Sequence, residues 1–190
     1  MRDSGFLLVD KPIGITSYDV IYKLRKITNI RKIGHAGTLD PLATGILIVA
    51  IGRECTKQID QFVKLDKKYL AVIDLSANTD TYDREGKITE EFSGEDISEE
   101  KISEVLKIFT GPQKQVPPMF SAKKIGGKKL CDLAREGKEV KREAVDIVVH
   151  TINMLQYKWP LVEAEIKVSS GTYIRSLAYD IGESWVQEGI

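Results

Sequence analysis

Runs of apolar residues separated by polar turns predict the strands of this chain. Gly5–Asp10 and Ile46–Ile51 are short and almost continuously apolar, as expected of buried strands. Apolar and polar residues alternate in Lys68–Leu75, which predicts a strand with one buried face. Two further apolar runs flank Trp159-Pro160 and predict a β-hairpin. The predicted strands are Gly5–Asp10, Ile46–Ile51, Lys68–Leu75, Lys87–Phe92, Val145–Tyr157 and Val162–Val168.

Apolar residues three or four positions apart predict the helices. The first helix follows a capping residue, either Thr16 or Ser17, and carries apolar side chains from Val20 to Ile27 on one face. Capping residues and glycines bound the later helices in the same way. The other predicted helices are Glu54–Val63, a segment from Asp96 or Ser98 to Phe109, Lys128–Glu136 and Tyr173–Trp185.

Glycine and proline residues place the main loops and turns. Gly34–Gly45 holds three glycines and a proline in 12 residues, which predicts a structured loop. Asn78–Gly86 is a polar turn, and Gln115–Pro118 must be extended because consecutive prolines exclude a helix. Gly126-Gly127 predicts another turn. Since helices and strands alternate without a regular rhythm, the predicted class is α+β with a mixed, largely antiparallel sheet flanked by helices.

Composition narrows the range of functions. The 190 residues are 42% apolar and 29% charged, which is typical of a soluble globular protein. No apolar run has the length of a membrane span or of a secretory signal, so we expect a cytoplasmic protein. Cys55 and Cys131 are too few to predict a disulfide framework. With only His35 and His150, and no ligand-like spacing, a zinc site is not expected.

Charge is distributed unevenly although the formal net charge is zero. Residues 1–70 and 105–143 carry net charges of +5 and +6, whereas residues 71–104 and 144–190 carry −8 and −3. If the two basic segments meet in space, they form a positive surface that attracts phosphates. The alternative is a set of solvated faces of alternating sign.

The Gly34–Gly45 loop is the first candidate for chemistry. Asp40 precedes Pro41, which keeps it out of helical conformation on a loop anchored to a buried strand. His35, on the same loop, could stack on a base or act as an acid or base. Both patterns also have plainer explanations, because Asp-Pro is a common turn pair and a lone histidine is often structural.

Four more features carry candidate side chains. Tyr69 follows two lysines, which suits a stacked base with a phosphate nearby, although tyrosine is also a common sheet residue. Arg175, near the start of a helix, needs a carboxylate partner if it is buried. Asp80 and Asp83 form an acidic turn that fits a glycosidase pair or simply a hydrated turn. A basic stretch could grip phosphates or be solvated; it holds Lys123, Lys124, Lys128, Lys129, Arg135, Lys138, Lys141 and Arg142.

Taken together, the motifs resemble the TruB family of transfer-RNA pseudouridine synthases in its bacterial form. Seven matching segments occur in the family's order and span nearly the whole chain, which makes chance similarity very improbable. They are GFLLVDKPIGITSYDV (Gly5–Val20), GHAGTLDPLATGIL (Gly34–Leu47), KKYLAVIDL (Lys67–Leu75), TDTYDREG (Thr79–Gly86), QVPPMFSAKKIGGKKL (Gln115–Leu130), AREGKEV (Ala134–Val140) and SSGTYIRSLAYDIG (Ser169–Gly182).

The resemblance implies a catalytic role for three residues. Asp40 matches the family's essential aspartate, Tyr69 matches the tyrosine that stacks on the target base, and Arg175 matches the arginine that pairs with the aspartate. Tyr69 is also a candidate base. The implied reaction is isomerisation of uridine 55 in the T loop of transfer RNA, without a cofactor or a metal.

The resemblance also implies residues that contact the substrate. His35 matches a histidine that helps to extract the target nucleotide, and Lys11 with Pro12 matches a turn beside the active site. Asp83 matches an acidic residue near that site. The full set of implied substrate-binding residues is His35, Lys11, Pro12, Asp83, Gly37, Thr38 and Leu39.

Further expectations concern the whole chain. Residues 1–190 are expected to form a pseudouridine synthase catalytic domain that is truncated at its C-terminal end, because the family's Leu-Arg-Arg strand and small RNA-binding PUA domain are missing. We expect a monomer that recognises the T-arm of transfer RNA without a protein partner or a membrane. Two other functions compete: a non-catalytic module that binds or folds transfer RNA, and a nucleoside or sugar hydrolase that uses Asp40 and Asp83.

Overall fold

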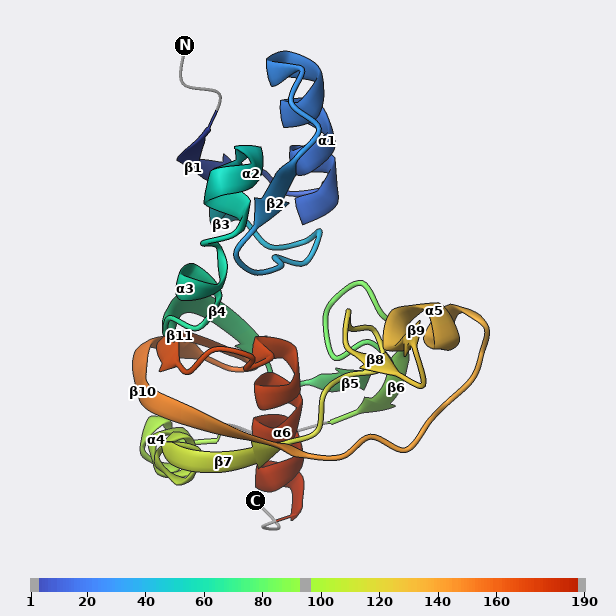
Figure 1. Ribbon diagram of the computed structural model, residues 1–190. Coiled ribbons are helices and arrows are strands. Elements are labelled where there is room, and N and C mark those ends of the chain that lie inside the picture. Colours follow the sequence, from blue (N-terminus) through green and yellow to red (C-terminus); the bar gives the residue numbers. More distant parts are fainter. Residues whose placement is uncertain (1–3, 93–96, 188–190) are drawn as a thin grey trace. The chain divides into compact units, whose positions relative to one another are not determined.

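The computed structural model describes residues 4–92 and 97–187 (Figure 1). The chain divides into two compact units, Met1–Leu65 and Asp66–Ile190, and each is described by itself. Among the described residues, every strand pairing is antiparallel. The largely antiparallel α+β architecture predicted from the sequence is therefore present, with its strands shared between two main sheets and two short hairpins.

The first unit is a three-stranded sheet, in the order β1-β3-β2, with helix α1 packed against it. The buried residues Val20 and Ile21 of the helix contact Leu47 and Val49 of the central strand. Its elements are β1 (Gly5–Lys11), α1 (Ser17–Thr28), β2 (Ile33–His35), β3 (Gly45–Ile51), α2 (Gly52–Thr56) and α3 (Asp60–Val63).

Helix α1 begins with a complete capping box. The Thr16 side chain accepts a hydrogen bond from the Asp19 backbone N–H, and the Asp19 carboxylate accepts one from the Thr16 N–H. The Asp19 carboxylate also accepts a hydrogen bond from the Thr16 hydroxyl at 2.6 Å, and this bond, together with the one from the Thr16 N–H, lowers the pKa of Asp19 below its usual value. Thr16 is thus the cap, and Ser17, the other candidate, is free to bond elsewhere.

The second unit is built on a four-stranded sheet in the order β4-β11-β10-β7. Its buried face holds Ile73, Val149 and Ile166, and these pack with Leu177 and Ile181 of α6 in one core. The elements are β4 (Lys67–Asp74), β5 (Ala77–Thr79), β6 (Ile88–Glu91), α4 (Glu99–Ile108), β7 (Gly111–Gln115), β8 (Lys124–Ile125), β9 (Lys128–Lys129), α5 (Leu130–Arg135), β10 (Val145–Lys158), β11 (Leu161–Val168) and α6 (Ile174–Gln187).

Two predicted helices differ from the structure, and strand β7 was not expected from the sequence. The helix predicted over Glu54–Val63 is two short helices, α2 and α3, and the second places Phe62 edge-on to Phe6 of β1. The helix predicted from Lys128 begins at Leu130, because Lys128 and Lys129 pair across a two-glycine turn in which both glycines have positive φ. Strand β7 was not predicted; its Pro112 is tolerated because β7 is an edge strand.

Helix α4 is capped by Ser98, whose side chain accepts from the Lys101 N–H. The alternative cap, Asp96, lies outside the described residues. Within the described ranges, no helix is both long and apolar enough to cross a membrane. Cys55 and Cys131 are free and half-buried.

Candidate active site

The loop that carries Asp40 is fixed to the sheet at both ends. It leaves β2 and returns to β3, and near its start the Ala36 N–H donates to the Ile48 carbonyl at 2.9 Å. Directly after Asp40, the Ala43 N–H donates to the Asp40 carbonyl at 3.0 Å and closes a tight turn. Gly37 and Gly45 adopt φ values of 132° and 120°, a region that favours glycine. Asp40 therefore sits on a loop of defined shape.

Ser17 holds the residue before Asp40 through the backbone. Its hydroxyl donates to the Leu39 carbonyl at 3.1 Å and accepts from the Leu39 N–H at 2.9 Å. The Ser17 side chain is buried at the first turn of α1. A rigid helix thus fixes the main chain next to the candidate catalytic carboxylate.

Lys11 holds the other side of the loop. Its side chain is fully buried, and its ammonium group donates to the carbonyls of Pro12, Ile15 and Pro41 at 3.0, 2.8 and 3.4 Å. Burial lowers the pKa of Lys11, and attraction to the charge of Asp40 opposes that shift. The Lys11-Pro12 turn therefore places a positive charge close enough to Asp40 to stabilise its carboxylate.

The other predicted residues of this unit surround the same loop. The Nδ1 atom of His35 contacts the Gly37 carbonyl, and since a carbonyl can only accept, Nδ1 carries a proton. Thr38 and Pro12 are exposed, whereas Leu39 is half-buried. The structure thus gathers Lys11, Pro12, His35, Gly37, Thr38, Leu39 and Asp40 into one region of the first unit.

In the second unit, Arg175 joins three separate segments. Its Nη1 atom donates to the Thr81 carbonyl at 3.0 Å and lies 3.4 Å from Oδ2 of Asp83. Its Nη2 atom donates to the Phe120 carbonyl at 2.9 Å. Both charged side chains are only 12% exposed, so this ion pair is well shielded from solvent.

Asp83 is held by its own turn. Its Oδ1 atom accepts from the Thr81 hydroxyl at 2.7 Å and from the Glu85 N–H at 3.0 Å, while Oδ2 faces Arg175. The sequence predicts that Asp83 lies near the active site. In the structure its carboxylate pairs with Arg175, another predicted site residue. The pairing of Arg175 with Asp40 stays a prediction.

The start of α6 is anchored by Gln115 at the end of β7. Its side-chain amide donates to the Tyr173 carbonyl at 3.0 Å, and its side-chain oxygen accepts from the Tyr173 N–H at 2.8 Å. One turn later in the sequence, the Ser176 hydroxyl donates to the Val116 carbonyl at 3.2 Å. The backbone around Arg175 is therefore fixed on both sides.

Tyr69 lies on strand β4, opposite Ile166 of β11. Its ring is half-buried and packs against the core of the second unit. One side chain thus combines an anchored ring with partial exposure, as a residue that stacks on a base requires.

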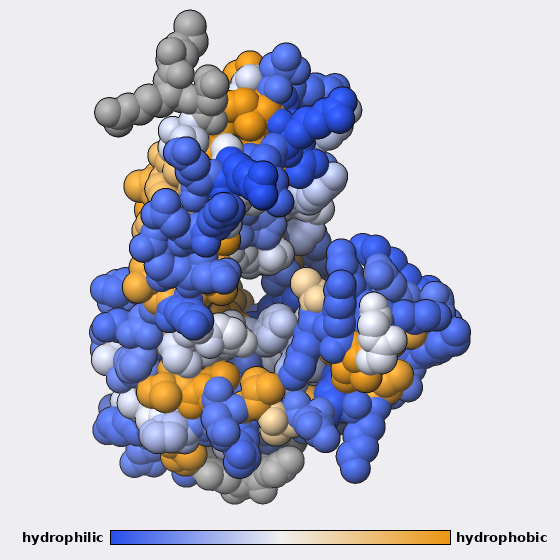
Figure 2. Space-filling model, viewed as in Figure 1, coloured by the Kyte–Doolittle hydropathy of each residue, from blue (hydrophilic) through white to orange (hydrophobic). Residues whose placement is uncertain are grey.

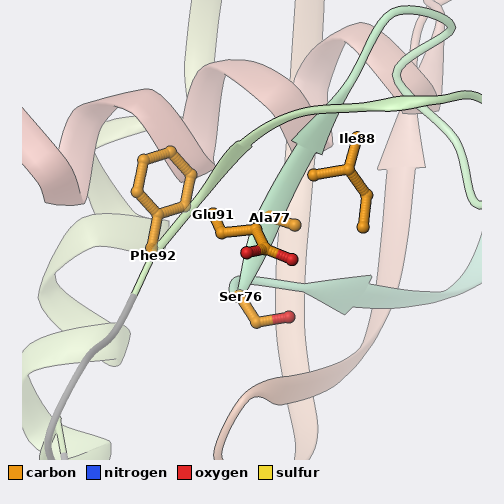
Figure 3. A pocket seen from close by; sticks show the side chains of 5 residues that line it. All are labelled: Ser76, Ala77, Ile88, Glu91 and Phe92. Atoms are coloured by element: carbon orange, nitrogen blue, oxygen red, sulfur yellow. The ribbon is translucent and has the colours of Figure 1, made fainter.

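Two surface cavities lie among the described residues of the second unit, and the residues that line them include no predicted site residue. One, of about 500 Å³, is lined by Ser76, Ala77, Ile88, Glu91 and Phe92 (Figure 3). Glu91 supplies a carboxylate to its lining. The second, of about 190 Å³, lies between β7 and α6 and includes Asp180. Burial raises the pKa of Asp180 to about 6, and the charge of Glu183 adds to the shift.

The sequence of this chain was compared with those of known protein families. Residues 25–174 match the N-terminal domain of the TruB family pseudouridylate synthases. The chain belongs to the TruB family. The match includes Asp40, Tyr69 and Asp83, and it ends one residue before Arg175.

Individual TruB relatives resemble the chain over most of its length. It is 51% identical over 181 residues to tRNA pseudouridine synthase B of Clostridium novyi (strain NT), covering 95% of this chain and 62% of the relative. It is 47% identical over 178 residues to the protein of the same name from Endomicrobium trichonymphae, covering 94% of this chain and 77% of the relative. The chain thus spans somewhat less than two thirds of the Clostridium protein.

Solved structures confirm the fold. A chain in the crystal structure of a Cbf5-Nop10-Gar1 complex superposes with a TM-score of 0.72 at 31% identity, covering 96% of this chain and 44% of that one. A chain in the structure of an H/ACA RNP bound to a substrate RNA gives 0.67 at 28% identity, covering 95% and 42%. The predicted pseudouridine synthase fold is therefore confirmed.

Several residues that shape this TruB site were not predicted from the sequence. Ser17 was expected only as a possible helix cap, and Gln115 only as the start of an extended segment. Both bind backbone groups far away in the sequence, and neither has a pattern that would reveal this. Among the described residues, no cluster of three or more His, Cys, Asp or Glu side chains could hold a metal ion.

Proposed function

We propose that this chain isomerises uridine to pseudouridine in the T loop of transfer RNA, at uridine 55, with Asp40 as the catalytic carboxylate. The observation that carries the proposal is the family match over residues 25–174, which places Asp40 within the matched TruB domain. Relatives of this chain bear the name tRNA pseudouridine synthase B. Residues 1–190, both compact units included, are taken as the catalytic domain.

The reaction breaks the bond between N1 of the base and C1′ of the ribose, turns the base, and joins C5 to C1′. The C5 proton is lost and N1 gains a proton, so the product is an isomer. A uridine in a folded loop must first be flipped out and held against an aromatic face, a role we assign to Tyr69.

Asp40 splits the reaction into easier steps. It acts either as a nucleophile at C1′ or as the base that removes the 2′ proton. Both routes require an ionised carboxylate, and the buried ammonium of Lys11 favours that form. The loop also holds the carboxylate in place before substrate arrives, since Ser17 and Lys11 fix the main chain on either side of it.

Arg175 and Tyr69 complete the proposed machinery. Arg175 pairs with the carboxylate of Asp40, and its planar fork orients that group in a way that a single ammonium cannot. Tyr69 takes the C5 proton as a second role. His35 assists the extraction of the nucleotide, and Asp83 contributes by holding Arg175.

We further propose transfer RNA as the partner, through its T-arm, with the chain acting as a cytoplasmic monomer. The loop sequence Gly34–Gly45 is of the bacterial type, which suggests recognition of RNA without a guide RNA or protein subunits. Phosphate contacts come from the basic stretch around the β8–β9 hairpin. No cofactor or metal is required by the proposed chemistry.

The test measures tritium release from T-loop transcripts that carry 5-tritiated uridine. Rejoining at C5 expels that hydrogen, so the wild-type chain should release tritium in proportion to pseudouridine formed. Asp40→Asn should fold normally and lose turnover by about 1,000-fold or more, because a missing nucleophile has no substitute. Arg175→Lys should also lose most of its turnover.

The outcomes separate the competing functions. Residual turnover above about a tenth in Asp40→Asn would remove this residue from the central role. Free uracil with its tritium retained would indicate a hydrolase. A folded wild-type chain that binds the transcript but releases no tritium would indicate a binding module.

A further inference from the structure

One face of helix α6 contacts the acidic turn at three successive helical turns. The side chains involved are four residues apart, which brings Arg175, Tyr179 and Glu183 to the same side of the helix. Their partners come from the segment that contains strand β5 and the turn after it. Arg175 pairs with Asp83, Tyr179 stacks on Tyr82, and Glu183 accepts a hydrogen bond from the Asn78 side chain.

The middle contact is an aromatic stack. The rings of Tyr82 and Tyr179 have centroids 4.1 Å apart and an interplanar angle of 24°. Burial, followed by the negative charge of Glu183, raises the pKa of Tyr179, so the Tyr179 phenol stays neutral across the physiological range.

Tyr82 stands between two residues that bind Arg175. The residue before it, Thr81, offers its carbonyl to Nη1, and the residue after it, Asp83, offers its carboxylate to the same atom. Any movement of Tyr82 along the helix shifts both groups at once. The stack thus controls the two acceptors that fix Nη1 of Arg175.

The turn resists movement in other ways. The Asp80 N–H donates to the Lys87 carbonyl at 3.0 Å, and the Lys87 N–H donates to the Asp80 carboxylate at 2.8 Å. A Cβ atom at Gly86 would lie 2.3 Å from the Thr81 hydroxyl oxygen and 2.6 Å from Oδ1 of Asp80, so a larger residue would displace these side chains. Tyr82 itself has a φ of 61°, an uncommon conformation for a non-glycine residue. The turn is therefore rigid, and its packing against α6 sets the orientation of the Asp83 side chain.

We infer that Tyr82 and Tyr179 form a positioning pair that holds the Thr81–Asp83 segment against α6 and thereby sets the direction of the Arg175 guanidinium. This inference rests on the proposed function, in which Arg175 orients the catalytic carboxylate. Gln115 fixes the backbone at the start of α6, and the tyrosine pair fixes the far end of the arginine side chain. Neither tyrosine touches the reacting atoms in this scheme.

The test uses variants that remove or keep the stack. Tyr82→Gly removes the ring and suits a positive φ, so the turn remains unstrained. Turnover in the tritium assay should fall about tenfold or more, because small displacements of a catalytic group have large effects. The dissociation constant for transfer RNA should change less than about twofold, since no RNA contact is lost. Tyr82→Phe and Tyr179→Phe keep the rings and should keep turnover.

Two further variants exclude a general loss of stability. Tyr179→Ala should match Tyr82→Gly, and the double variant should be no worse than either, because both remove the same stack. Tyr157→Ala is the matched control, since this tyrosine packs in the same core and donates to the Ile97 carbonyl. It should lower the melting temperature while turnover per folded molecule stays unchanged.

A second measurement tests the pair without any turnover. The Arg175 guanidinium signal in a 15N spectrum, assigned with Arg175→Lys, reports proton exchange with water. Exchange should accelerate in Tyr82→Gly and stay slow in Tyr82→Phe. Unchanged exchange in Tyr82→Gly, or equal loss of turnover in the Phe variants, overturns the inference. A wild-type chain without tritium release contradicts the proposed function alone, because the exchange measurement still decides the positioning role.

Discussion

Lys11 is fully buried at the end of β1, and its ammonium group contacts backbone carbonyls from two segments of the first unit. A buried cation is tolerated when its donors are satisfied, and here three carbonyls satisfy them. The same side chain lies close enough to Asp40 for their charges to interact. Stability and the electrostatics of the candidate site therefore depend on one residue.

Lys11→Met should destabilise the first unit by at least about 2 kcal/mol, because the carbonyls of Ile15 and Pro41 would lose a charged donor. Thermal unfolding, followed by circular dichroism, measures this loss. Lys23→Met is the matched control, since Lys23 lies exposed on α1. Equal melting temperatures for the two variants would contradict the bridging role of Lys11.

Asp180 makes stability depend on pH. Its pKa is raised from 3.8 to about 6 by burial and by the charge of Glu183. Folding favours the protonated form of Asp180. The contribution of this residue to the free energy of unfolding is therefore fully present below pH 3.8 and is lost as pH rises through about 6. Lys114 also lines this cavity, but its ammonium pairs with Asp146 at 2.8 Å.

Asp180→Asn should therefore raise the melting temperature at pH 7.5 and leave it almost unchanged near pH 4. The amide stays neutral over the whole range and removes the penalty for burying a charge. Melting curves between pH 4 and 8 test this, with Asp146→Asn as the control for loss of an exposed aspartate. A pH-independent difference between Asp180→Asn and the wild type would exclude the burial argument.

At the scale of elements, the β8–β9 hairpin concentrates positive charge. Lys124, Lys128 and Lys129 are exposed on two short strands joined by Gly126-Gly127. Hydrophilic side chains dominate the surface over β8, β9 and α5 (Figure 2). The hairpin has the composition of a phosphate-binding element, which is the function proposed for the basic stretch.

Lys128→Gln combined with Lys129→Gln should weaken the binding of transfer RNA to the same extent whatever the nucleotide sequence of that RNA. Each lost phosphate contact should flatten the plot of log affinity against log salt by about one unit. Fluorescence anisotropy at several salt concentrations gives this slope, and turnover at saturating RNA should persist. Lys101→Gln with Lys107→Gln on α4 is the charge-matched control. An unchanged slope in the hairpin variant would remove β8–β9 from the RNA-binding surface.

Elements with strong periodicity or clear caps could be predicted from the sequence. The α1 helix, the α4 helix and the β10–β11 hairpin were, because each combines an apolar face with capping or turn residues near its ends. The break between α2 and α3 could not be, since it depends on Phe62 meeting Phe6 of a distant strand. Strand β7 could not be predicted for a similar reason. It forms by pairing with β10, which is distant in the sequence, and its Pro112 is a residue that argues against a strand.

The candidate site was predictable to the extent that single residues carry chemistry. Asp40, Arg175 and Asp83 stand in recognisable motifs, and the ion pair between the last two emerges only from the structure. The supporting residues Ser17 and Gln115 could not be predicted, because they bind main-chain groups, and such contacts do not depend on the sequence of the partner segment. Tyr82 and Tyr179 are 97 positions apart by their numbering, so their stack could not be foreseen either.

At the scale of the whole molecule, two separate cores accompany the two compact units. One core lies between α1 and the three-stranded sheet, and the other lies between the four-stranded sheet and helices α4 and α6. They share no residue. Each unit thus has its own source of hydrophobic stabilisation.

Ile166→Ala should loosen one unit selectively. Ile166 is fully buried in the second core, and its truncation should reduce stability by about 3 kcal/mol through lost contacts and a cavity. Amide hydrogen exchange should accelerate in β4, β10 and β11 while β1 and β3 keep their protection. Equal acceleration in both units would indicate a single cooperative core.

Ser17 and Gln115 have a consequence for how this protein can be varied. Ser17 binds the backbone N–H and carbonyl of Leu39, and Gln115 binds those of Tyr173. These hydrogen bonds do not involve the side chains of Leu39 and Tyr173. In a saturation library, positions 39 and 173 should therefore accept many replacements, whereas 17 and 115 should accept almost none. The tolerant positions adjoin Asp40 and precede Arg175 by two residues, so substrate preference could be redesigned there without disturbing the scaffold.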